Sequence, residues 1–254
     1  MNALVAARPV YPRLERPLQS ALLRLVLSRC KHTSGTPPVV VFDLDGTLMD
    51  NRPRTCAILR ELGALWQATE PEIAGRLLAA SPDKVPYHFR DTLALLGVTR
   101  EDLATQAFEY WKTHFFADPH IQHDIEVTGA ARFARDCYEA GASIVYLTGR
   151  DLPQMGLGTF GSLRDLGFPI GVCGTELVLK PEARMLDFEF KRFEAPKLAR
   201  VGRVVAAFDN EPENCNVFLS QFPDAESVLV DTQHAAGAPP LAPGVKVIPD
   251  FSYG

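Results

Sequence analysis

The chain has 254 residues, 46% of them hydrophobic and 22% charged, which is the composition of an ordinary globular protein with one or two domains. Its formal net charge of -5 argues against a general basic surface for nucleic acid or anionic lipid. Five cysteines without a CxxC pair argue against a disulfide framework or a zinc site. We therefore expect reduced thiols and a cytoplasmic location, with no membrane span, because no apolar run is long enough.

Residues 1–36 are predicted to form an N-terminal extension that contains several prolines. Its stretch "LQSALLRLVL" is interrupted by Arg24, and no small-residue cleavage site is obvious. These features favour an amphipathic helix that packs on the body of the protein over a signal peptide. Organelle targeting by this Arg-rich start is the alternative.

The body begins with a predicted buried strand at residues 39–43, and a helical block follows at residues 51–117. Apolar residues recur there three and four apart, and glycine or proline separates the segments. Because no strand interrupts this block, we predict an insertion into a core of residues 37–50 and 118–254. The four expected helices are "RTCAILRELGALW", "EPEIAGRLLAA", "YHFRDTLALLG" and "REDLATQAFEYWKTHFF".

Beyond the block, predicted strands alternate with predicted helices. Helices are expected at "TGAARFARDCYEAG", with Thr128 as its cap, at "APKLARVG" and at "EPENCNVFLSQF". A further helix is expected to end at Leu166–Gly167. Alternation of apolar strands with helices predicts an α/β fold, a doubly wound parallel sheet that is covered on both faces. The expected strands are "ASIVYLTG", "PIGVCG", "ELVLK", "RVVAAFDN", "SVLVDT" and "VKVIP".

Polar side chains follow three of these strands, as Asp43-Leu44-Asp45, Thr148-Gly149-Arg150 and Asp209-Asn210-Glu211. Each group alone is compatible with a turn or a helix cap. All three, however, fall at the carboxyl edge of the sheet, where ligands bind in open α/β folds. Carboxylates that meet there repel one another unless a cation lies among them, and oxygen ligands without His or Cys favour Mg²⁺.

The stretches "DLDGTL", "YLTGR", a lysine and "FDNEPEN", in this order, resemble the four motifs of the haloacid dehalogenase superfamily of phosphohydrolases. The resemblance runs from about residue 39 to residue 232 and leaves out the extension and the tail. It implies a Rossmann-like core, a small helical cap at residues 51–117, and hydrolysis of a phosphomonoester with Mg²⁺ as the cofactor.

The resemblance also implies roles for individual residues. Asp43 would be the nucleophile that forms an aspartyl-phosphate, and Asp45 would be the general acid and base. The carboxylates of Asp43 and Asp209 and the main-chain carbonyl of Asp45 would hold the metal. The phosphoryl oxygens would be bound by Thr148 and by the main-chain amides around Gly46 and Gly149.

Two assignments stay open at this point. The third-motif lysine is expected to be Lys191 in "DFEFK", just before a helix, and Lys180 is the alternative. Whichever of the two is not the motif lysine is expected to be a solvated surface residue. The fourth motif has Asn210 where an acid is common, so the group that supports the metal is Glu213 or Asn210.

Several other signals are discounted. The glycines of "GLGTFG" (156–161) do not follow a strand directly, so we expect a loop or a helix start rather than a dinucleotide site. We interpret "DPHIQHD" (118–124) as a solvated linker and not as a second metal site, and the aromatic residues of "WKTHFF" as packing within the block. The basic residues of the block are candidates for contacting an anionic substrate, but solvated positions are expected for all five: Arg52, Arg54, Lys84, His88 and Arg90.

The resulting hypothesis is a Mg²⁺-dependent phosphatase that acts on a small phosphorylated metabolite. A nucleic-acid 3′-phosphatase is the nearest alternative, but the negative charge disfavours it. A phosphotransferase and a non-catalytic module that binds phosphate or metal are further alternatives. The oligomeric state and the identity of the substrate are not encoded in any motif.

Overall fold

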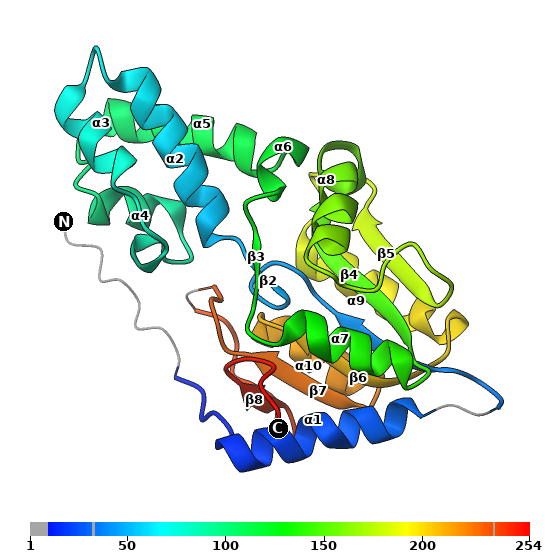
Figure 1. Cartoon of the computed structure of the whole chain (residues 1–254). Coiled ribbons are helices and arrows are strands. Elements are labelled where there is room, and N and C mark those ends of the chain that lie inside the picture. The colour runs from blue at the N-terminus through cyan, green and yellow to red at the C-terminus, as the bar shows by residue number, and fades with distance from the viewer. Residues whose placement is uncertain (1–9, 32–33, 236) are drawn as a thin grey trace.

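The computed structural model describes residues 10–31, 34–235 and 237–254. A six-stranded sheet forms the body, with every neighbouring pair parallel and the order β5-β4-β1-β6-β7-β8 (Figure 1). The central strand β1 is buried along its whole length, since β4 and β6 flank it and helices cover both faces. The strands are β1 (Pro38–Phe42), β4 (Ser143–Asp151), β5 (Thr175–Lys180), β6 (Arg203–Asp209), β7 (Glu226–Val230) and β8 (Lys246–Ile248).

Alternate residues of β1 enter two separate apolar layers, because successive side chains of a strand point to opposite faces. Val40 and Phe42 pack in one layer, and Val39 and Val41 pack in the other. The predicted doubly wound sheet is therefore confirmed. The first layer is covered by α1 (Arg16–Cys30), α7 (Ala130–Glu139) and α8 (Leu152–Asp165), and the second by α9 (Asp187–Glu194), the 3-10 helix η2 (Ala195–Arg200) and α10 (Pro212–Gln221).

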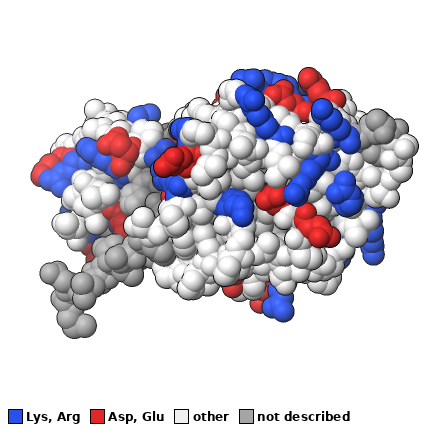
Figure 2. Space-filling view, turned by 90° about the horizontal axis from the view of Figure 1, so that it is seen from below, with Lys and Arg blue, Asp and Glu red and all other residues white. Residues whose placement is uncertain are grey.

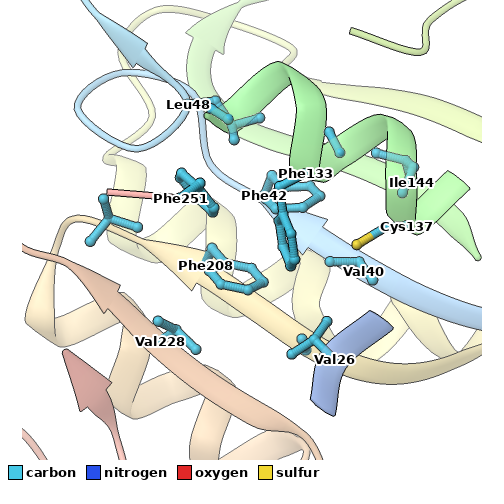
Figure 3. Packing of buried hydrophobic residues seen from close by; sticks show 14 of the residues in the cluster. Val26, Val40, Phe42, Leu48, Phe133, Cys137, Ile144, Phe208, Val228 and Phe251 are labelled. Atoms are coloured by element: carbon cyan, nitrogen blue, oxygen red, sulfur yellow. The ribbon is translucent and has the colours of Figure 1, made fainter. Parts of the chain in front are cut away.

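A group of phenylalanine rings lies at the centre of the first layer, among aliphatic side chains (Figure 3). The rings of Phe42 and Phe208 stack with centroids 5.1 Å apart, and those of Phe133 and Phe251 stack at 5.6 Å. Val26 of α1 packs on the same cluster and is fully buried. The expectation of an amphipathic helix on the body is thus confirmed, while residues 1–9 and 32–33 of the predicted extension lie outside the described part.

The predicted helical block contains all four expected helices: α2 (Arg52–Trp66), α3 (Pro71–Leu78), α4 (Phe89–Leu95) and α5 (Glu101–Phe115). They enclose a hydrophobic cluster of their own and lie to one side of the sheet (Figure 1). The antiparallel pair β2 (Met49–Asp50) and β3 (Ile125–Glu126) joins the block to the body. The short helix η1 (Pro82–Lys84) lies within the block, and α6 (Asp118–Ile121) follows it directly. The domain boundaries at residues 36, 51 and 117 stay predictions.

Three local expectations were wrong. "PIGVCG" forms a turn and not a strand, since Gly171 and Gly174 adopt positive φ. Thr128 does not cap α7; the carboxylate of Glu126 accepts a hydrogen bond from Ala131 N instead. Residues 156–161 lie inside α8, and β4 continues through an irregularity to its end at residue 151. The helix expected at "APKLARVG" is present and is of the 3-10 type.

Acidic and basic side chains are interspersed on the face shown in Figure 2, as a net charge near balance leads one to expect. Within the described residues, no helix combines the length and apolarity that crossing a membrane requires. The five cysteines are all described and are free thiols, four of them buried. The cytoplasmic location stays a prediction.

A polar contact anchors α1 to the C-terminal segment. Arg16 forms a bidentate ion pair with Asp250, with N–O distances of 2.6 and 2.7 Å, and the buried Gln19 donates to Asp250 O at 2.8 Å. The hydrogen bonds from Arg16 hold the pKa of Asp250 below its usual range, although partial burial opposes this.

We expect Asp250→Asn to lower the free energy of unfolding by about 1 kcal/mol at pH 7, since Arg16 is largely exposed and solvent screens the pair. A carboxyl whose pKa is depressed on folding stabilises the protein above its unfolded pKa of about 4 and loses that effect as pH falls further. Urea unfolding should therefore show the difference between wild type and variant shrinking below about pH 4. Asp165→Asn, which removes an exposed pair with Arg164, is the matched control; equal stability of Asp250→Asn and wild type at pH 7 would contradict the prediction.

Candidate active site

The ammonium group of Lys191 lies between two buried carboxylates. Its Nζ is 2.7 Å from Asp43 Oδ1 and 2.7 Å from Asp209 Oδ2. Asp43 directly follows β1 and Asp209 ends β6, so the pairing of these adjacent strands brings the two acids together. Lys191 lies just before the 3-10 helix η2 that leads to β6, as expected, but it is itself part of α9, a helix that the sequence did not predict.

Lys180 occupies a different environment. Its ammonium bonds to Asp187 Oδ1 at 2.7 Å and to Met185 O at 3.0 Å. It is nearly buried rather than solvated, so the expectation of a surface position for the rejected lysine was wrong. The structure thus brings Lys191, and not Lys180, to the carboxylates of Asp43 and Asp209.

Burial strongly perturbs this group of charges. It raises the pKa of Asp43 to about 7 against the opposing effect of Lys191, and Asp209 adds to the rise. Burial alone would lower the pKa of the Lys191 ammonium, but Asp209 and Asp43 together hold it well above its usual value. Lys191 is therefore fully protonated at neutral pH and neutralises part of the carboxylate charge.

The loop after Asp43 is shaped by a glycine and a threonine. Gly46 has φ +78°, and a Cβ at this position would lie 2.5 Å from Asn210 Nδ2. The Thr47 hydroxyl donates to Asp43 Oδ2 at 3.0 Å, and Asn210 donates to Gln233 O. Thr47 orients the Asp43 carboxylate, a role that the sequence analysis did not assign, although Thr47 is the fifth residue of the "DLDGT" motif.

Asn214, rather than Glu213, supports Asp209. The Oδ1 atom of Asp209 accepts hydrogen bonds from Glu211 N at 2.9 Å and from Asn214 Nδ2 at 3.1 Å. Glu213 is exposed on α10, and Asn210 bonds elsewhere, so neither expected residue contacts Asp209. Asn214 was missed because its side chain carries no charge. Its Oδ1 is buried and has no hydrogen-bond partner.

Two buried arginines hold the side chain of Asp45. Arg150 Nε and one of its terminal nitrogens lie 2.8 and 2.7 Å from the two Asp45 oxygens, and Arg54 approaches to 3.0 Å. Both arginines also pair with Asp124, whose side chain is fully buried. The solvated positions expected for Arg54 and for the linker at Asp124 were therefore wrong. Although burial opposes it, Arg150 and Arg54 hold the pKa of Asp45 well below its usual range.

Thr148 and Gly149 lie in the irregular part of β4. The Thr148 hydroxyl is buried and accepts a hydrogen bond from Arg150 N at 3.3 Å. At Gly149 a Cβ would lie 2.1 Å from an oxygen of the Asp187 side chain, so that side chain would have to move to admit a larger residue. Gly149 and Gly46 both line the cavity into which Asp43 faces.

That cavity has a volume of about 500 Å³ and is lined by residues of both the sheet edge and the helical block. Within the described ranges, no three side chains of His, Cys, Asp or Glu are grouped so as to hold a metal ion. The Asp45 side chain faces the arginines, so its main-chain carbonyl is the group of this residue that remains for a cation, and the metal assignment stays a prediction. Two carboxylates and a carbonyl are hard oxygen donors that fit a hydrated Mg²⁺, and the unpartnered Asn214 Oδ1 is a buried acceptor for a metal-bound water.

No model of a known protein family matches the sequence, and no curated protein matches it either. Among solved structures, the chain resembles a candidate phosphatase of Clostridium difficile with a TM-score of 0.52 and 16% identity, over 80% of this chain and 89% of that one. It resembles a haloacid dehalogenase superfamily hydrolase of Geobacter sulfurreducens with a TM-score of 0.50 and 14% identity, over 87% and 96% of the two chains. A protein tyrosine kinase A of Mycobacterium tuberculosis gives a TM-score of 0.51 and 15% identity, over 85% and 94%. These likenesses show a shared fold, as the motifs predict.

We expect Asp124→Asn to lower the free energy of unfolding by about 3 kcal/mol, because it leaves two buried arginines with one carboxylate between them. Glu72→Gln is the matched control. It removes an exposed pair with Arg76 one helical turn away and should cost no more than about 0.5 kcal/mol. Denaturant unfolding of both variants measures the difference, and similar values for the two would show that the buried network contributes little.

Proposed function

We propose that this chain, which has the fold of haloacid dehalogenase-like hydrolases, is a Mg²⁺-dependent phosphatase that hydrolyses a phosphomonoester through an aspartyl-phosphate on Asp43. The observation that carries the proposal is the fixed position of the Asp43 carboxylate. Lys191 holds one of its oxygens and Thr47 the other, at the wall of a cavity large enough for a small metabolite.

In the first step a carboxylate oxygen of Asp43 forms a bond to phosphorus as the bond to the leaving oxygen breaks. Lys191 limits the negative charge that builds up around the attacking group, and the Gly46 and Gly149 main chain lets the phosphoryl oxygens approach closely. Mg²⁺, held by the carboxylates of Asp43 and Asp209 and the carbonyl of Asp45, would offset the repulsion between carboxylate and phosphate.

Asp45 is the group that donates a proton to the leaving oxygen and later accepts one from the attacking water. An ionised Asp45, as the two arginines favour, suits the second step, in which it takes a proton from the water that attacks the aspartyl-phosphate. The first step needs the protonated form to donate to the leaving oxygen. Asp45 must therefore loosen its contact with at least one arginine when substrate binds, and Arg54, which belongs to the helical block, is the partner that a movement of the block would remove.

We expect Asp43→Asn to reduce Mg²⁺-dependent phosphate release from p-nitrophenyl phosphate by at least about 1,000-fold, since the amide is a far poorer nucleophile. Circular dichroism should show that the variant stays folded. A chelator should abolish the wild-type activity, and Glu72→Gln should retain it. Full activity of Asp43→Asn would end the proposal.

The covalent step has a direct readout. In a single turnover in H₂¹⁸O, attack of water at phosphorus places the label in phosphate, with or without a covalent intermediate, whereas attack at the carboxyl carbon of an aspartyl-phosphate places it in Asp43. The trapped intermediate therefore decides whether the step is covalent. Mass spectrometry of a trapped, phosphorylated peptide that contains Asp43 should show the intermediate. Turnover without phosphorylation of that peptide would favour direct attack by water.

A further inference from the structure

The helical block contributes an aromatic wall to the cavity. Phe89 and Trp111 stack with centroids 4.4 Å apart and planes 9° from parallel, and Trp111 lies 4.7 Å from Phe115. Tyr87 and Phe116 also line the cavity and are partly exposed. The side of the cavity away from the Asp43 carboxylate is therefore apolar and aromatic, a surface that gains free energy by covering a ring of a ligand.

This wall carries no cation for an anionic ligand. Of the described residues that line the cavity, only Arg150 and Lys191 are cationic, and each already pairs with two carboxylates. Glu211 and Glu213 also line the cavity, and although burial raises the pKa of Glu211 to about 7, neither offers a positive charge. A carboxylate or a second phosphate on the leaving group would meet like charges without a partner. The cavity lining does not include the five basic side chains of the helical block that were candidates for contacting an anionic substrate: Arg52, Arg54, Lys84, His88 and Arg90.

One polar group of the block is left without a partner. Thr92 lies on α4, one turn after Phe89, lines the cavity and is fully buried, yet its hydroxyl has no hydrogen-bond partner. The nearby Thr55 differs, since its hydroxyl accepts a hydrogen bond from Trp111 Nε1 at 3.1 Å. A buried hydroxyl without a partner is costly, and a polar atom of a bound ligand would satisfy it.

We propose that the substrate is the phosphomonoester of an alcohol that carries an aromatic ring without negative charge, and that the Thr92 hydroxyl binds a polar group on that ring. The inference rests on the proposed phosphatase function and specifies its substrate class. The ring would lie against the aromatic wall of Phe89, Trp111 and Phe115, while the phosphoryl group faces Asp43.

Esters of primary alcohols test the class, because their leaving groups are chemically similar. We expect kcat/KM for 2-phenylethyl phosphate to exceed that for glycerol 3-phosphate at least about tenfold, through burial of the ring. A 4-carboxylate on the ring should lower kcat/KM about tenfold again, through like-charge repulsion. A preference for glycerol 3-phosphate or for the carboxylated ester would overturn the inference. Absence of turnover with every ester, p-nitrophenyl phosphate included, would instead overturn the phosphatase function.

Thr92→Val tests the polar contact. Among the 2-, 3- and 4-hydroxyphenyl analogues of 2-phenylethyl phosphate, the best should exceed the parent ester about fivefold in kcat/KM, and Thr92→Val should remove that advantage. The free energy of unfolding should stay equal or rise, because the lost hydroxyl had no partner in the protein. Thr113→Val, which removes an exposed hydroxyl that bonds only to Glu109 O, is the matched control. The role of Thr92 would be refuted if no hydroxyphenyl analogue had a higher kcat/KM than the parent ester. It would also be refuted if Thr92→Val kept the higher kcat/KM of the best analogue.

Discussion

The site depends on the buried ammonium of Lys191 and its two bonds, to Asp43 and to Asp209. The two carboxylates end neighbouring parallel strands, so the fold forces them together, and burial alone would make two such charges strongly unfavourable. Lys191 relieves this repulsion and at the same time ties α9 to the carboxyl edge of β1 and β6. Removal of the lysine would therefore affect both the orientation of Asp43, the proposed nucleophile, and the electrostatics of the whole crevice.

A second buried network links this chemistry to the helical block. Asp45 comes from the sheet edge, Arg150 from β4, Arg54 from α2, and Asp124 from the segment that returns to the body. The carboxylate with the proposed proton-transfer role is thus held jointly by the block and the body. A displacement of α2 would change the charge environment of Asp45, which gives the position of the block a direct effect on catalysis.

The two parts of the chain divide the cavity between them. The sheet edge contributes the carboxylates, the lysine and the glycines, which suit a phosphoryl group. The block contributes rings and one unpartnered hydroxyl, which suit an uncharged aromatic group. The fold is shared with solved proteins that are named for hydrolysis and for kinase activity, so the fold alone does not decide which phosphoryl reaction occurs. Specificity for the leaving group therefore depends on the side chains of the block.

The sequence by itself determined the strand and helix pattern and the edge at which Asp43, Asp45 and Asp209 lie, because hydrophobic periodicity and the end of an apolar strand are local properties. It also favoured Lys191 over Lys180. Only the tertiary structure decided which polar residues are buried. From the sequence, Arg54 and Asp124 were expected to be solvated, and the charged Glu213 was expected in the supporting role instead of Asn214. One position along α10 separates Asn214 from Glu213, and that step of about 100° turns one side chain to Asp209 and the other to solvent. Burial and helix orientation arise from packing between distant segments, which no local pattern encodes.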